Sequence, residues 1–170
     1  MVKSVVLTLV GDDQPGIVQA VSELVELHQG DWIDGHMANL SGKFAGILEA
    51  SIPDAQYPAF CAAVDAGIEG LEITCETVGG DSVAVGQCYN LELVGQDHPG
   101  IVHRISATIA ANGATIDELN SEVSDASMSG EKLFKASIKL CLPPEQEIDH
   151  LGEVLEQLTN ELIVDIELGD

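Results

Sequence analysis

Two copies of one short pattern carry the residues of this chain whose types and spacing could do chemistry. The pattern G-x-D-x-P-G-I-V starts at Gly11 and again at Gly95, 84 residues later. Apolar alternation precedes each copy and helical periodicity follows it, so each copy predicts a turn from a strand into a helix. The first turn of a helix leaves backbone N–H groups without intrahelical partners, and the helix dipole favours an anion there. A ligand that carries a carboxylate suits such a turn.

The acidic residue in each turn adds a second charge to this candidate site. Asp13 and Asp97 precede the expected helices and could accept a hydrogen bond from a ligand ammonium group. An anion site beside a carboxylate matches the zwitterion of a free amino acid, and binding needs no nucleophile or general base. An Asp before a helix is also a common N-cap, in which the carboxylate accepts bonds from the same N–H groups. The pattern leaves both roles open.

The elements around the two turns predict one fold built twice. Apolar periodicity gives the order βαββαβ in each copy, which is the ferredoxin-like arrangement of two helices on one face of an antiparallel sheet. The fold class is therefore α+β, with two tandem domains at 1–78 and 87–170 joined by a linker at 79–86. The expected elements are 5–9, 17–28, 32–40, 43–52, 57–68 and 71–75 in the first copy, and 89–94, 101–111, 115–123, 133–142, 148–158 and 162–168 in the second.

The two copies differ in length at two places. Matching Gly30 with Gly113 as the residue that ends the first helix implies the loss of one residue in the second copy. The next strand then matches at an offset of 83, whereas Phe44 matches Phe134 at 90, so seven residues are gained in the hairpin at 124–132. We expect this insertion to be a mobile surface loop, with a partner-binding flap as the alternative.

Composition restricts the classes of partner. The net charge is −23, from 29 acidic and 6 basic residues, which disfavours DNA, RNA and anionic membranes as direct partners. Neither a signal peptide nor an apolar run long enough to span a membrane is found, so we expect a soluble cytoplasmic protein. The cysteines form no C-x-x-C pair and are expected to be reduced and free; they are Cys61, Cys75, Cys88 and Cys141.

The D-x-P-G-I-V turn in a βαββαβ unit of this size resembles the ACT domain, a regulatory module that commonly binds amino acids between paired domains. Two tandem copies, with Asp34-x-x-Met37-x-x-Leu40-x-Gly42-x-Phe44 after the first helix, are similar to the glycine cleavage system transcriptional repressor family. The resemblance covers residues 2–78 and 87–168 and implies ligand contacts from both turns. The implied contacts are Asp13, Pro15, Gly16, Asp97, Pro99 and Gly100. His98 lies inside the second turn and could contact a ligand carboxylate, so we include it in the expected site.

The resemblance also points to the start of the second strand, where amino-acid-binding ACT domains often have an Asn before an Ile. The matching positions here are Trp32 and Thr115. Thr115 could still hydrogen-bond a ligand, whereas Trp32 offers only its indole N–H. We therefore include Thr115 in the expected site.

Together these features predict a double-ACT regulator that binds glycine or another amino acid and controls a protein partner. By resemblance, the partner is a DNA-binding activator of glycine cleavage genes. Edge strands of such units often pair into a continuous sheet, so we expect a homodimer. We expect no cofactor, no catalytic residues and no metal, since His98 and His103 are five residues apart and do not share a helical face. The alternatives are a protein-only interaction module, or a small enzyme that uses Asp13 or His98.

Overall fold

The computed structural model describes residues 1–79, 86–125, 130–158 and 162–169. The chain divides into two compact units, Met1–Asp81 and Ser82–Asp170. Most of the linker expected at 79–86 lies outside the described residues, and so does the middle of the hairpin insertion at 124–132. Each unit is therefore described by itself.

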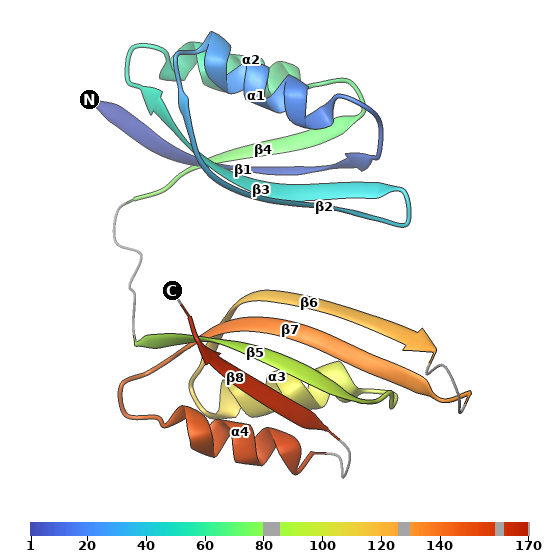
Figure 1. Cartoon of the computed structure of the whole chain (residues 1–170). Coiled ribbons are helices and arrows are strands. Elements are labelled where there is room, and N and C mark those ends of the chain that lie inside the picture. Colours follow the sequence, from blue (N-terminus) through green and yellow to red (C-terminus); the bar gives the residue numbers. More distant parts are fainter. Residues whose placement is uncertain (80–85, 126–129, 159–161, 170) are drawn as a thin grey trace. The chain divides into compact units, whose positions relative to one another are not determined.

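The first unit has the predicted βαββαβ order. Its strands form an antiparallel sheet in the order β2-β3-β1-β4, and both helices cover one face of this sheet (Figure 1). The elements are β1 (Val2–Asp12), α1 (Ile17–Leu27), β2 (Asp31–Leu40), β3 (Lys43–Pro53), α2 (Tyr57–Ala66) and β4 (Leu71–Thr77).

The second unit repeats this arrangement with the sheet order β6-β7-β5-β8, again with both helices on one face (Figure 1). Its elements are β5 (Gln87–Gln96), α3 (Ile101–Ala111), β6 (Thr115–Asp125), β7 (Lys132–Leu142), α4 (Ile148–Glu156) and β8 (Ile163–Leu168). The predicted fold class, two ferredoxin-like units with antiparallel sheets, is confirmed. Among the described residues, no helix is long and apolar enough to cross a membrane.

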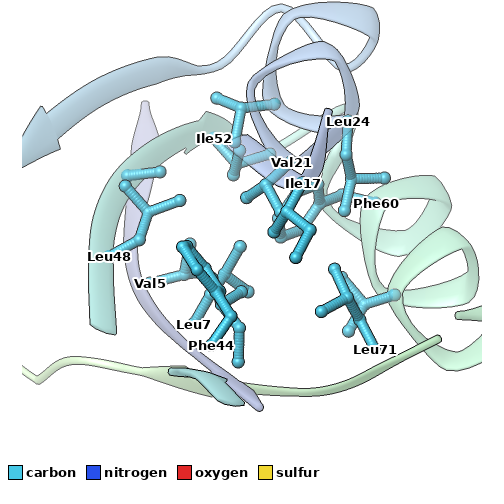
Figure 2. Packing of buried hydrophobic residues seen from close by; sticks show 14 residues of the cluster. Val5, Leu7, Ile17, Val21, Leu24, Phe44, Leu48, Ile52, Phe60 and Leu71 are labelled. Atoms are coloured by element: carbon cyan, nitrogen blue, oxygen red, sulfur yellow. The ribbon is translucent and has the colours of Figure 1, made fainter. Parts of the chain in front are cut away.

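Alternation along the central strands places one apolar row against the helices. In β1, Val5, Leu7 and Leu9 are fully buried, and successive strand residues point to opposite faces, so the residues between them face away from the helices. Figure 2 shows how the two helices close over this row. The labelled side chains that meet there are Val5, Leu7, Ile17, Val21, Leu24, Phe44, Leu48, Ile52, Phe60 and Leu71. The second unit has its own core, built from the corresponding elements.

The register of the two copies differs from the sequence-based match. The left-handed residue after α1 is Gln29, with φ 55°, and its counterpart after α3 is Gly113, with φ 71°. Each donates its N–H three residues back, to Glu26 and Ala110 respectively. These positions are 84 apart, so no residue is lost, and matching Gly30 with Gly113 was wrong. The error arose because a glutamine occupies the conformation that usually selects glycine.

The corrected offset of 84 extends through β2 and β6. Both strands carry a β-bulge at the same place, between Trp32 and Asp34 in β2 and between Ile116 and Glu118 in β6. Because the offset rises from 84 here to 90 at Phe44 and Phe134, the hairpin gains six residues rather than seven. The structural counterpart of Thr115 is therefore Asp31, and that of Trp32 is Ile116.

Two of the four cysteines are not free. Cys88 of β5 and Cys141 of β7 are direct register partners and form a disulfide, whereas Cys61 and Cys75 are free thiols. The expectation that all four are reduced is therefore wrong for this pair. The partners are 53 residues apart in sequence, so only the pairing of β5 with β7 brings them together.

Candidate functional site

Both predicted turns end in a glycine that the backbone requires. Gly16 and Gly100 are the N-cap residues of α1 and α3 and have left-handed conformations, with φ 90° and 83°. A side chain is strained at such φ values. A Cβ on either glycine would meet no atom within 4 Å, so backbone conformation rather than crowding explains the residue type. The G-x-D-x-P-G pattern thus encodes a strand that turns sharply into a helix.

The aspartates of the two turns do not cap the helices. Within the described residues, neither α1 nor α3 has a hydrogen bond from an N-terminal N–H to a capping side chain. The N-cap role that the sequence left open for Asp13 and Asp97 is therefore not adopted. Their backbone N–H groups instead donate to the hairpins, to the carbonyl of Gly42 in the first unit and of Lys132 in the second, at 2.9 Å each. Each turn is thereby fixed to the end of a hairpin.

The second turn borders a hollow of about 380 Å³. We call it the second-turn hollow. Its walls come from three elements: the turn and the start of α3, the end of β6, and one residue of β7. The lining residues are Asp97, His98, Pro99, Gly100, Ile101, Val102, Ser121, Glu122, Val123 and Phe134. Four of the expected ligand contacts, residues 97 to 100, therefore come together at one cavity.

The second-turn hollow combines acidic groups with an apolar wall. Asp97 and Glu122 are its carboxylates, and among its lining residues there is no Lys or Arg. A cationic group of a ligand would be attracted to these carboxylates. An anionic group could bind at the N-terminal end of α3 and beside the His98 ring. Val102, Val123 and Phe134 supply apolar surface. This combination suits a small zwitterion.

Thr115 does not belong to this hollow. It lies at the start of β6 opposite Cys141, and Cys141 in turn pairs with Cys88 near the start of β5. Asp97 follows the other end of β5, after Gln96. Eight residues of extended strand separate those ends, which is roughly 26 Å at the usual rise per residue. Thr115 and Asp97 of one unit therefore cannot contact the same amino acid.

The second hairpin also lines the hollow, with three residues that were not predicted from the sequence: Ser121, Glu122 and Val123. The hydrogen bond from Asp97 to the carbonyl of Lys132 holds this hairpin beside the turn. The strand pairing could have indicated this contribution. Val123 pairs with Phe134, and Phe134 also pairs with Gly95, which lies just before the turn. The end of β6 must therefore lie near the turn.

The first turn has different surroundings. Asp13, Pro15 and Gly16 are exposed, and the Gln14 side-chain amide donates to the carbonyl of Glu69 at 3.2 Å. A hollow of about 490 Å³ lies nearby, but it is lined by the end of β1, by Lys43 and by residues 70 to 72, without these three predicted contacts. Lys43 forms an ion pair with Asp12 at its rim. The structure thus gathers the predicted site residues at the second turn and not at the first.

Comparisons with known proteins agree with this fold. Residues 3–67 match the family model of the ACT domain, which confirms the resemblance for the first unit. An unknown protein from Galdieria sulphuraria is 26% identical, and the match covers 100% of both chains with a TM-score of 0.85. A candidate glycine cleavage system transcriptional repressor is 17% identical over 99% of each chain, with a TM-score of 0.71, which shows a shared fold. No curated protein sequence matches significantly.

Proposed function

Because residues 3–67 match the family model of the ACT domain and the second unit repeats the fold of the first, we propose that this chain is a regulatory protein that senses a small amino acid. The observation that carries the proposal is the second-turn hollow, where a left-handed glycine opens α3 beside two carboxylates. ACT domains are regulatory modules, and this proposal assigns the sensing role to the second unit.

In the proposed complex, the ligand lies with opposite charges toward opposite walls of the hollow. Its carboxylate faces the start of α3, where the helix dipole favours an anion. Its ammonium group faces Asp97 and Glu122, which are hydrogen-bond acceptors. A hollow of about 380 Å³ also admits a side chain beside Val102 and Val123, so glycine is the first ligand to test and not the only one.

We propose that the output is a protein contact rather than DNA binding. The chain carries 29 acidic residues against 6 basic ones, and phosphate backbones are bound mainly through Lys and Arg. The similar structure described as a candidate transcriptional repressor motivates a role in transcription. The partner that fits both points is a DNA-binding activator of glycine cleavage genes, which the chain would repress indirectly. Ligand binding would bias this contact through its different affinities for two packing states.

We further propose a homodimer, because each sheet ends in edge strands, which can pair with the edge strand of a second copy. If Thr115 contacts an amino acid that is bound at Asp97, the two residues must come from different copies of the chain. Analytical ultracentrifugation at micromolar concentration tests the dimer, and a monomer at all concentrations with and without ligand would exclude it.

The deciding experiment is a thermal-unfolding screen with each of the twenty amino acids. A ligand at 100 times its dissociation constant should stabilise the fold by about 2.7 kcal/mol. The shift should be lost in Asp97→Asn and reduced in Glu122→Gln, and it should persist in the matched first-turn variant Asp13→Asn. Isothermal titration calorimetry then gives the stoichiometry.

Two other functions predict different results in the same screen. A protein-only interaction module predicts that no amino acid raises the unfolding midpoint of the parent protein. A small enzyme using Asp13 or His98 predicts that an added substrate is consumed, which mass spectrometry of the incubated mixture would detect. We favour the sensor because the second-turn hollow contains complementary charges for binding, whereas among the described residues no hydrogen bond joins its Ser121 hydroxyl to the His98 ring.

A further inference from the structure

A second cluster of reactive side chains lies at the other end of the second sheet, far from the second-turn hollow. Cys88 is in β5, Cys141 is in β7 and Asp117 is in β6. Leu91 and Leu93 face the core, so alternation places Cys88 on the sheet face that the helices leave uncovered. Its register partner Cys141 lies on that same face.

The β-bulge in β6 brings the carboxylate to the two sulfurs. Asp117 is the extra residue of the bulge between Ile116 and Glu118, so it has no register partner in β7. Its Oδ2 lies 3.2 Å from the Sγ of Cys141. One potential ligand atom from each of the three side chains lies within 4.8 Å of the other two. A bulge often redirects a side chain in this way.

We propose that Cys88, Cys141 and Asp117 form a site for a thiophilic divalent ion of the zinc class once the disulfide is reduced. Two thiolates and one carboxylate are a donor set that zinc accepts, with a solvent water as fourth ligand. In a tetrahedral site with zinc–sulfur bonds of about 2.3 Å, the two sulfurs lie roughly 3.7 Å apart. Directly paired positions on neighbouring strands can provide that separation.

Metal binding and disulfide formation are alternative reactions of the two thiols, Cys88 and Cys141. On metal binding each thiol loses one proton, so two protons are released for each ion that binds. Formation of the disulfide removes two electrons from the sulfur pair and passes them to an oxidant such as a small-molecule disulfide, which is reduced to two thiols. The oxidised pair has no thiolate, so the site binds the ion only in the reduced state.

The first unit offers an internal comparison, because the same three positions lack these donors. At the established offsets of 84 and 90, Cys88 corresponds to Ser4, Cys141 to Ser51 and Asp117 to Ile33. Ser4 instead donates a hydrogen bond to Glu49 at 2.7 Å. The donor set is therefore a property of the second unit and is not required by the fold.

The cluster is accessible from solvent. Asp117 is exposed and both cysteines are half-buried, so a reductant and a metal ion can reach them. The net charge of −23 raises the concentration of cations near the surface.

Cobalt titration of the intact chain tests the proposal directly. The protein is reduced with a phosphine reductant, freed of excess reagent without air, and titrated with Co²⁺, whose thiolate complexes absorb in the near ultraviolet. We expect this absorption to saturate at one ion per chain and to disappear when Zn²⁺ is added. The disulfide form should give none. In Cys88→Ser the absorption should be lost, and in Asp117→Asn the affinity should fall at least tenfold.

The control is the double variant Cys61→Ser with Cys75→Ser, which removes the two free thiols of the first unit and should leave the titration unchanged. Circular dichroism checks the fold of each variant, and Asp117→Asn gives a test that retains both cysteines. The proposal is overturned if reduced protein gives no thiolate–cobalt absorption, or if the absorption persists in Cys88→Ser.

Discussion

Gln29 and Gly113 occupy equivalent positions after α1 and α3, and both have a left-handed backbone, with φ 55° and 71°. Each donates its N–H at 2.9 Å to the carbonyl three residues earlier. The first unit thus makes the same turn with a residue that has a Cβ. Such a residue is less stable than glycine in this conformation by about 1–2 kcal/mol.

We predict opposite effects of substitution at these two positions. Gln29→Gly should raise the free energy of unfolding of the first unit by about 0.5–1 kcal/mol, because the strain exceeds the entropy that glycine adds to the unfolded chain. Gly113→Ala should lower the free energy of unfolding of the second unit by more than about 1 kcal/mol. The alanine would be strained by its left-handed backbone, and its Cβ would lie 3.3 Å from a side-chain carbon of Pro143. Urea unfolding measures both.

Glu23→Gly is the control for that pair, because Glu23 is exposed in the middle of α1. Glycine in a helix interior should lower stability by about 1 kcal/mol. If Gln29→Gly also lowered stability, the left-handed conformation would not be the source of strain.

The two turn glycines should respond equally to substitution. Gly16→Ala and Gly100→Ala should each lower the free energy of unfolding by about 1–2 kcal/mol, because both have φ above 80° and neither Cβ would meet an atom within 4 Å. Thermal unfolding compares them in otherwise identical chains. A clearly larger loss at one position would show that crowding, and not backbone strain alone, selects glycine there.

Core truncation should cost the same order of free energy in each unit. Leu7 and Leu91 are equivalent, fully buried residues of the central strands β1 and β5. Leu7→Ala and Leu91→Ala should each destabilise its own unit by about 2–5 kcal/mol. Thr8→Ala, on the exposed face beside Leu7, should change stability by less than about 0.5 kcal/mol. Hydrogen exchange resolved by peptide shows which unit is affected, and protection lost equally in both units would contradict the assignment of separate cores.

The Cys75 thiol should make stability depend on alkaline pH. Burial, and secondly repulsion from Cys61, raise the pKa of Cys75 from 9.0 to about 11. The unfolded chain then releases this proton at a lower pH than the folded chain. The stabilising contribution is therefore complete below pH 9 and is lost as the pH rises from about 9 to 11. Urea unfolding under reducing conditions should show a steeper loss in this range for the parent than for Cys75→Ser; parallel profiles would exclude the effect.

Much of the fold could be predicted because its signals are local. The alternation around Leu7 and Leu91 specified strands, and the spacing of Ile17, Val21 and Leu24 specified a helix with one buried face. The register could not be fixed in the same way. A glycine is the usual mark of a left-handed helix end, and Gln29 takes that conformation without the mark.

The site could be predicted only in part because its walls come from segments distant in sequence. The turn from Asp97 to Gly100 was found from its repeat, whereas Glu122 joined it only through the pairing of β6 with β7. Thr115 was included by resemblance, and the strand order places it at the far end of the sheet. The disulfide was missed for the same reason, since 53 residues separate Cys88 from Cys141.

The internal repeat also shows which equivalent positions carry the same residue and which differ. Between the copies, the helix-facing pairs Leu7 with Leu91 and Leu9 with Leu93 keep the same residue, and all four are fully buried. On the opposite face, the second unit has Cys88 where the first unit has Ser4, and both residues are half-buried. Exposed changes usually alter stability by less than about 0.5 kcal/mol, whereas core changes cost several times more. The two copies can therefore share one pattern of buried residues while their uncovered sheet faces carry different chemistry.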